Sequence, residues 1–319
     1  MKDPMQLQRV VVTGGSGFVG RAVCRRLAAR WPGLRIVVPT RRADHAAALR
    51  PLPNVETPVA DVHDPAALAS LLDGADALVQ LVAILHGSDS DFERVHVTLP
   101  RTLAAACRAA GVQRLVQVSA IGVAADAPSN YLRSKARGEQ VLQDAGLDLS
   151  ILRPSVIFGA EDRFLNLFAS LQALAPVMPL GGSGARFQPV WVEDVAEAVL
   201  RSLAAPVPPL VECAGPQVYT LSELVRLAGR WSGHERLQIP LPDTLTRLQA
   251  ALLQRAPGPT MMSLDNVESM KVPNVASGTL PGLQALGITP ASLEVVMPPL
   301  LAGRGCRSHL DALRATAGR

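Results

Sequence analysis

The chain contains very little lysine, few aromatic residues and no block of positive charge. Among 319 residues, lysine occurs only at positions 2, 135 and 271, and aromatic residues make up 3%. Proteins that bind nucleic acid need basic patches and aromatic platforms on which bases stack. The net charge of +4 comes mainly from scattered arginines, so we expect no nucleic-acid partner. Because lysine is so rare, any well-placed lysine is informative.

Cysteine is also scarce. The four cysteines lie far apart, without a CxxC pair, at Cys24, Cys107, Cys213 and Cys306. The six histidines show no metal-ligand spacing. We therefore expect reduced, structural thiols and no metal site.

Long apolar segments are absent. The polar start, 1–9, leads into an apolar run that is too short for the core of a signal peptide. The longest apolar stretches, 77–85 and 295–302, fall short of the roughly 20 residues that span a bilayer. We expect a cytoplasmic protein, with peripheral contact to the inner membrane left open, present as a monomer or homodimer.

Short β-branched runs alternate with Ala- and Leu-rich helical stretches through the first half of the chain. Strands are predicted over 9–13, 35–39, 56–60, 77–83, 115–119 and 149–152. Such alternation, with mostly apolar strands, indicates a parallel sheet covered by helices on both faces. We therefore predict an α/β fold whose doubly wound parallel Rossmann sheet occupies 1–155.

The rhythm breaks after Arg153-Pro154, where the composition becomes richer in proline and glycine. A loop is predicted over 176–184, and later segments are mostly helical. We predict a smaller, mostly helical C-terminal substrate lobe over 156–319. Its segment 186–205 is expected to pack back onto the Rossmann domain, and its last residues, 305–319, to form a loose tail.

A glycine-rich turn, GGSGFVG, follows the first predicted strand and opens a predicted helix. Gly14 suits the tight turn, Gly17 lets a pyrophosphate approach the backbone, and Gly20 lets the helix pack close to the strand. Amides in the first helical turn then face the diphosphate. An ordinary strand–helix turn is the alternative. Predicted cofactor contacts here are Gly14, Ser16, Gly17, Phe18, Val19 and Gly20.

The end of the second predicted strand bears on which dinucleotide binds. An acidic residue there favours NAD(H), but this chain has Arg41 and Arg42 after Thr40. Guanidinium groups suit a 2′-phosphate, so NADP(H) is favoured over NAD(H). Two solvated loop arginines are the alternative. After the third strand, Asp61 and Val62 are placed to contact the adenine, although a simple loop role for Asp61 competes.

Tyr131 and Lys135 are four residues apart on a predicted helix, so their side chains share one face. A phenol serves as a general acid or base when its pKa falls, and a neighbouring ammonium lowers it. The pair also follows the fifth predicted strand, where this architecture presents reactive groups. We predict that Tyr131 and Lys135 are catalytic, and that Lys135 also contacts the cofactor.

These features together resemble the short-chain dehydrogenase/reductase superfamily, in its extended or atypical branch. The matching segments are TGGSGFVG, YLRSK, RPSVIFG and PVWVEDVA. Within the branch, YLRSKARGE and ILRPSVIFGAEDRFLN resemble the subgroup of NADPH-binding accessory subunits of respiratory complex I and their bacterial epimerase/dehydratase-like relatives. The resemblance covers about 9–205. The resemblance does not extend beyond residue 210, the part of the chain that would determine which substrate is bound.

The resemblance implies roles for the remaining candidates. Tyr131 would be the acid/base and Lys135 would hold the nicotinamide ribose. Further cofactor contacts would come from Leu81, Val82, Ala83, Pro154 and Val156.

One expected catalytic residue is missing. The family's catalytic Ser or Thr falls at Ile121 here, and Ser119 is either a backbone cap or a proton relay. The segment between Ser119 and Tyr131 is also short. Two hypotheses remain open: an NADP(H)-dependent oxidoreductase or epimerase-like enzyme acting on a quinone, an isoprenoid or a sugar nucleotide, or a non-catalytic NADPH-binding accessory protein of a membrane-associated respiratory complex.

Overall fold

A computed structural model describes residues 7–255 and 260–302. These divide into two compact units, each described here by itself. The first unit contains 7–154, Val192–Cys213 and Ala276–Thr289. The second contains Ser155–Trp191, the described part of Ala214–Val275, and 290–302. No helix in the described ranges is long and apolar enough to cross a membrane.

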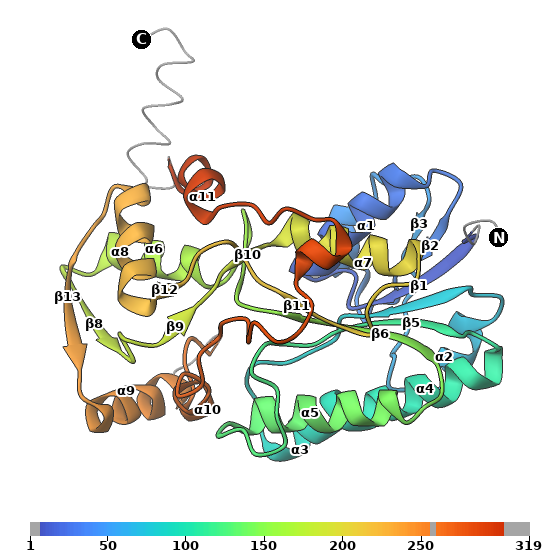
Figure 1. Cartoon of the computed structure of the whole chain (residues 1–319), viewed down its shortest axis with the longest axis horizontal. Helices are drawn as coiled ribbons and strands as arrows, with labels where there is room; N and C mark the ends of the chain where they lie inside the picture. Colours follow the sequence, from blue (N-terminus) through green and yellow to red (C-terminus); the bar gives the residue numbers. More distant parts are fainter. Residues whose placement is uncertain (1–6, 256–259, 303–319) are drawn as a thin grey trace, which may run out of the picture. The chain divides into compact units, whose positions relative to one another are not determined.

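The first unit is built on a seven-stranded parallel sheet (Figure 1). Its order is β11-β6-β5-β4-β1-β2-β3, and every neighbouring pair is parallel. The strands are β1 (Arg9–Thr13), β2 (Arg35–Val37), β3 (Val55–Glu56), β4 (Ala77–Gln80), β5 (Arg114–Val118), β6 (Asp148–Pro154) and β11 (Leu210–Cys213). The order reverses between β1 and β4, which is the position where doubly wound sheets bind their ligands. The predicted Rossmann sheet is confirmed.

Helices cover both faces of this sheet, as the apolar strands require. They are α1 (Phe18–Arg30), α2 (Pro65–Leu72), α3 (Asp89–Glu93), α4 (Leu99–Ala110), α5 (Asn130–Gln143) and α7 (Val192–Ala204). Shorter 3₁₀ turns are η1 (Ala43–Leu49) and η3 (Leu283–Leu286). Helices α2, α4 and α5 lie on one face, whereas α1 and α7 pack together on the other (Figure 1). The middle of β1, Val10 to Val12, is fully buried between them.

A π-helical turn, η2 (Arg94–Thr98), lies between α3 and α4. Pro100 explains this turn, because it has no N–H to donate to the carbonyl of His96 one α-turn earlier. The N–H of Leu99 instead bonds the carbonyl of Arg94, five residues back. Turns of this kind are frequent at functional sites.

The second unit combines helices with short two-stranded sheets. Its helices are α6 (Leu165–Leu174), α8 (Leu221–Ser232), α9 (Asp243–Arg255), α10 (Leu264–Ser269) and α11 (Leu293–Leu301). Its strand pairs are β7 (Ile157–Phe158) with β10 (Val190–Trp191), β9 (Arg186–Phe187) with β12 (Tyr219–Thr220), and β8 (Val177–Gly181) with β13 (Leu237–Leu241). Its core includes Phe158, Leu224 and Met297, with Trp191 and Trp231 packed against them.

Strand β8 corrects the loop predicted over 176–184. Pro179 made a strand look unlikely, since proline cannot donate to a ladder. Strand β8 forms a two-stranded sheet with β13. Within the described ranges, its other edge has no neighbouring strand that would need a hydrogen bond from the backbone of Pro179, so the proline is tolerated there. The segment Ala276–Thr289, which we assigned to the C-terminal lobe, lies in the first unit. The predicted tail, 305–319, and Cys306 fall outside the described residues.

Candidate functional site

The glycine-rich turn connects β1 to α1. Gly14 has a φ of +75°, in the left-handed region that glycine adopts without strain. A Cβ on Gly14 would lie 2.9 Å from the backbone of Leu81 and Val82 at the end of β4. At Gly20 a Cβ would overlap the backbone of Gly14 and Gly15. Glycine at both ends therefore lets β1, β4 and α1 approach closely.

Helix α1 begins without a side-chain cap. Its N-cap residue is the exposed Gly17, and no acidic residue lies in the first turn. The first amides of a helix have no partner inside the helix, and the dipole makes this end positive. The half-buried Phe18 and Val19 carry two of these amides, and Ser16 precedes them with its carbonyl bonded to Arg21 at 3.1 Å. The arrangement suits a diphosphate.

Beyond β2, the two candidate arginines differ in their surroundings. Arg42 forms an exposed ion pair with Asp44, at 2.8 Å, and this pairing lowers the pKa of Asp44. Arg41 is exposed. Burial lowers the pKa of His63, and Arg94 and Arg41 add to this effect. Arg41 is thus the more available of the two for a phosphate.

Asp61 caps its own turn, because its carboxylate accepts from the N–H of His63 at 3.0 Å. The loop role that competed with adenine recognition is therefore present. One carboxylate can accept several hydrogen bonds, so adenine recognition by Asp61 stays a prediction. Val62 packs against the first unit's core.

The segment after β4 is held in place from its start. Leu81 donates its N–H to Thr13 at 3.0 Å, and Val82 donates to the buried side chain of Gln80 at 3.2 Å. Leu81 and Val82 are half-buried, whereas Ala83 is exposed. The strand predicted over 77–83 consequently ends at Gln80, and the three candidate residues form a fixed segment beside the glycine-rich turn.

Helix α5 presents both catalytic candidates. Ser129 caps the helix by accepting from Leu132 at 3.2 Å. The Nζ atom of Lys135 lies 5.8 Å from the centroid of the Tyr131 ring and donates to the carbonyl of Val118 at 3.3 Å. The sequence spacing therefore does bring phenol and ammonium onto one face, at the carboxyl end of β5.

Burial dominates the titration of this pair. It lowers the pKa of Lys135 to about 8, with the nearby Glu139 carboxylate acting in the opposite direction. Burial also raises the pKa of Tyr131 above its ordinary value. The expected lowering of the Tyr131 pKa by Lys135 is therefore wrong for the protein alone. Desolvation of the phenol by burial is the cause of this rise.

Ser119 lies at the end of β5, close to fully buried. Its N–H bonds the carbonyl of Leu152 at 2.7 Å, but its hydroxyl has no hydrogen-bond partner within the described ranges. The hydroxyl therefore does not act as a cap, and a buried unpaired hydroxyl is costly unless something else binds it. Ile121, the position of the missing Ser or Thr, is buried, and its N–H bonds Pro154 at 2.9 Å.

The two candidates after β6 belong to different units. Pro154 ends β6 in the first unit, where its carbonyl accepts from Ile121. Val156 lies in the second unit, and Asn274 accepts from its N–H at 2.8 Å. Asn274 also accepts from the hydroxyl of Ser155 at 2.7 Å, so the start of this segment has a defined conformation.

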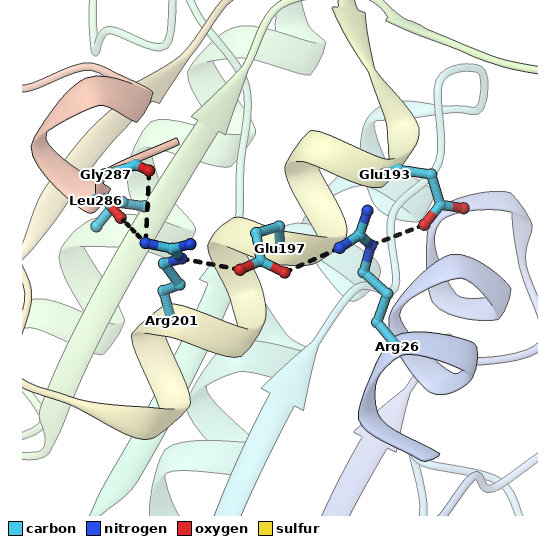
Figure 2. A network of polar contacts seen from close by, with 6 residues as sticks. All are labelled: Arg26, Glu193, Glu197, Arg201, Leu286 and Gly287. Carbon is cyan, nitrogen blue, oxygen red and sulfur yellow. Dashed lines mark hydrogen bonds and ion pairs between the residues drawn. The ribbon is translucent and has the colours of Figure 1, made fainter. Parts of the chain in front are cut away.

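The acidic pair that opens α7 is partly explained by ion pairing. Figure 2 shows Arg26 of α1 between two carboxylates of α7: Glu193 at 2.8 Å and Glu197 at 2.9 Å. Glu197 also pairs with Arg201 at 2.8 Å, and Arg201 bonds the carbonyl of Leu286 at 2.8 Å. This network attaches the phosphate-loop helix to α7, so Glu193 has a structural role.

Sequence reasoning missed two buried residues beside Lys135. Glu139 lies one turn further along α5 and forms an ion pair with Arg153 at 2.5 Å. His96, in the π-helical turn, bonds Ser134 at 2.8 Å. Glu139 was detectable from its spacing, because it follows Tyr131 and Lys135 at intervals of four. His96 gave no signal, since its partner lies 38 positions away.

The parallel sheet, the glycine-rich turn and the uncapped helix define a dinucleotide-binding protein. Residues 14–206 match the family described as NAD(P)H-binding. The chain belongs to this family of NAD(P)H-binding proteins.

Named relatives fall into two groups. The chain is 30% identical to the mouse (Mus musculus) mitochondrial NADH dehydrogenase [ubiquinone] 1 alpha subcomplex subunit 9 over 293 residues, which cover 89% of this chain and 77% of that protein. It is 34% identical to a ceramide reductase of Caulobacter vibrioides over 238 residues, covering 73% and 74%. The accessory-subunit resemblance is confirmed, and one relative is named as a reductase.

Solved structures share the fold. An Escherichia coli NADPH-dependent quinone oxidoreductase, complexed with NADPH, aligns with a TM-score of 0.73 at 24% identity, over 90% of this chain and 98% of that one. A dTDP-glucose 4,6-dehydratase from Streptomyces venezuelae, with NAD bound, also gives 0.73, at 22% identity over 97% and 98%. At such identities the likeness concerns the fold alone.

Proposed function

We propose that this protein is an NADPH-dependent reductase of a ketone carried on an apolar molecule, such as a long-chain lipid or an isoprenoid quinone. The observation that carries the proposal is the pairing of Tyr131 and Lys135 on α5. Bound NADPH would supply a hydride, to the carbonyl carbon of a ketone or, with a quinone, to the conjugated system that becomes the quinol. Tyr131 would donate a proton to the carbonyl oxygen. Lys135 would hold the ribose, and its positive charge would stabilise the phenolate that remains.

The surroundings of Tyr131 support an apolar substrate. The phenol packs in a cluster with Ala120, Val123, Ala127 and Leu132. The side chains of this cluster carry no charge that would bind a sugar nucleotide. Two relatives are named for apolar substrates: the ceramide reductase and a farnesyl-dihydroquinoline-oxide ketoreductase of Stigmatella aurantiaca, which is 30% identical over 175 residues.

Several features fit a bound dinucleotide. The amides of Phe18 and Val19 suit the diphosphate, and the buried Ser119 hydroxyl needs a partner. The segment from Leu81 to Ala83, with Pro154, would flank the nicotinamide. Gly14, Ser16, Gly17 and Gly20 would form the cradle, and Asp61 with Val62 would contact the adenine.

The preference for NADPH rests on the arginines after β2. Arg41 is free to meet a 2′-phosphate, whereas Arg42 is engaged by Asp44. Replacing Arg41 by Ala should weaken NADPH binding about 10- to 100-fold, as expected for loss of a charge-assisted contact. NADH binding should change less than about 2-fold. Arg42→Ala is the matched control and should have the smaller effect. Equal losses for the two coenzymes would refute the 2′-phosphate contact.

The function is tested by mixing NADPH-loaded protein with long-chain 3-oxo lipids, isoprenoid quinones and 4-oxo sugar nucleotides. Absorbance of the reduced nicotinamide reports turnover. We expect oxidation with an apolar ketone or quinone and none with the sugar nucleotides. Turnover restricted to sugar nucleotides would refute the substrate class, and absence of oxidation across the panel would refute the reductase.

A non-catalytic accessory protein is the second candidate. Ile121 in place of a hydroxyl residue and the raised pKa of Tyr131 both favour it, as do the relatives named as complex I subunits. NADPH would then act by stabilising the folded chain, and the partner would be a respiratory complex at the inner membrane. In that case Tyr131→Phe would leave every cellular phenotype unchanged, whereas weakening the cofactor cradle would not.

A further inference from the structure

His96 occupies a central position between two parts of the first unit. It lies in the π-helical turn η2, and its side chain is almost completely buried. Its Nε2 atom accepts from the backbone N–H of Ile84 at 3.2 Å. Its Nδ1 atom lies 2.8 Å from the hydroxyl of Ser134 on α5. One ring thus contacts both the segment after β4 and the helix of the catalytic pair.

The hydrogen bonds specify one form of the ring. A backbone N–H can only donate, so Nε2 must carry a lone pair, and the proton of the neutral imidazole resides on Nδ1. That proton is donated to Ser134, whose hydroxyl in turn donates to the carbonyl of Tyr131 at 2.8 Å. Protonating the ring would break the bond to Ile84. Burial and the nearby Lys135 oppose this, and they lower the pKa of His96 to about 3.

Packing reinforces the same position. The His96 ring stands edge-on to the Tyr131 ring, with centroids 5.6 Å apart, and contacts Phe92 at 5.5 Å. A Cβ on Gly138 would overlap the carbonyl oxygen of His96. Glycine at this position therefore lets η2 approach α5 more closely than any other residue would allow. The ring and the backbone of His96 both fix the distance between the two elements.

We propose that His96 is a positioning residue that sets the distance between the nicotinamide-side segment, 81–84, and the helix that carries Tyr131 and Lys135. The inference rests on the proposed binding of NADPH by this site. In this role His96 needs no contact with substrate or cofactor. It acts through Ile84 on one side and through Ser134 and Tyr131 on the other. Small displacements of reacting groups cost large factors in rate, so such a residue matters beyond stability.

Three substitutions separate the parts of this role. His96→Phe keeps a ring but removes both hydrogen bonds. His96→Gln places an amide oxygen near the former Nε2, where it can accept from Ile84. His96→Asn places an amide near the former Nδ1, where it can donate to Ser134. Phe92→Leu is the matched control, because it loosens the same ring cluster without removing either hydrogen bond.

The first readout does not depend on turnover. It combines the fluorescence of bound NADPH, the dissociation constant of NADPH and the melting temperature of the protein. His96→Phe should change the fluorescence of the bound nicotinamide and weaken binding about 10-fold, and His96→Gln should restore both. Phe92→Leu should lower the melting temperature without these changes. If His96→Phe lowers the melting temperature alone, His96 is merely structural and the proposal fails.

The second readout is the ring itself. Nitrogen NMR of histidine-labelled protein should show His96 as the neutral Nδ1–H form, unchanged between about pH 5 and 8; an Nε2–H form or a titration in that range would overturn the proposal. With an active substrate, His96→Phe should lower kcat at least about 10-fold while KM changes less than about 3-fold. If the substrate panel shows no turnover, the proposed reductase fails, but fluorescence and NMR still decide the role of His96.

Discussion

Lys135 lies over the ring of Tyr131, with its ammonium nitrogen 5.8 Å from the ring centroid, and donates to the carbonyl of Val118. The ammonium is thus buried close to the aromatic ring of Tyr131. This geometry accounts for the two pKa shifts. Lys135 loses hydration and becomes a weaker base, while Tyr131 loses hydration and becomes a weaker acid.

Replacing Lys135 by Met should stabilise the protein at neutral pH. A lysine whose pKa falls from 10.5 to about 8 on folding destabilises the folded state at every pH where it is charged in the unfolded chain. The penalty is complete below pH 8 and disappears as the pH rises towards 10.5. We expect Lys135→Met to increase the free energy of unfolding by on the order of 2–3 kcal/mol at pH 7.

The measurement is urea unfolding of both proteins from about pH 7 to 10.5. Buried thiols such as Cys24 and Cys107 have raised pKa values, of about 12, and destabilise both proteins alike at high pH. The difference between the two curves therefore isolates Lys135. A difference that stays constant with pH would contradict the account, as would a less stable variant at pH 7.

Gly20 should be indispensable for cofactor binding. A Cβ there overlaps backbone atoms of the glycine-rich turn, which cannot yield as a side chain can. We expect Gly20→Ala to weaken NADPH binding more than about 100-fold, because the turn and helix α1 are forced apart. Gly33→Ala is the control: a Cβ meets nothing within 4 Å, and its φ is not in the left-handed region. A fluorescence titration measures the NADPH affinity of both variants. Comparable losses of affinity in the two variants would refute the steric argument.

The network in Figure 2 predicts unequal roles for two adjacent arginines. Arg26 is about one-third exposed and bridges two carboxylates. Arg25 is half-exposed and, among the described residues, pairs only with Glu193, at 3.2 Å. Arg26→Met should lower the free energy of unfolding by about 1–2 kcal/mol, and Arg25→Met by less than about 0.5 kcal/mol. Urea denaturation measures the free energy of unfolding of both variants. Equal losses would show that the ion-pair bridge of Arg26 adds no stability.

Much of the fold could be predicted because the relevant signals are local. The apolar run of β1 and the glycines that follow it specify a strand, a turn and a helix within twelve residues of one another. The Tyr131–Lys135 spacing likewise specifies a shared helix face. These features depend on periodicity and backbone freedom, which can be read from adjacent residues.

What could not be predicted depends on distant contacts. The strand predicted over 77–83 ends at Gln80, whose side chain is bonded by the distant Thr13 and accepts from the N–H of Val82. The π-helical turn at His96 could have been suspected from Pro100, but its bond to Ser134 could not. The pKa of Tyr131 depends on burial, which a spacing of four residues does not reveal.

The central claim is that Tyr131 delivers a proton as hydride leaves NADPH. It is tested most directly by single turnover with NADPH deuterated at the nicotinamide C4, on either face, and the ketone that is consumed fastest. We predict that deuterium from one face appears at the former carbonyl carbon of the product. With Tyr131→Phe, the label should stay on the coenzyme although NADPH binds within about 2-fold of the original affinity. Deuterium transfer that is unaffected in Tyr131→Phe, or absent with both labels in the unaltered protein, would contradict the claim.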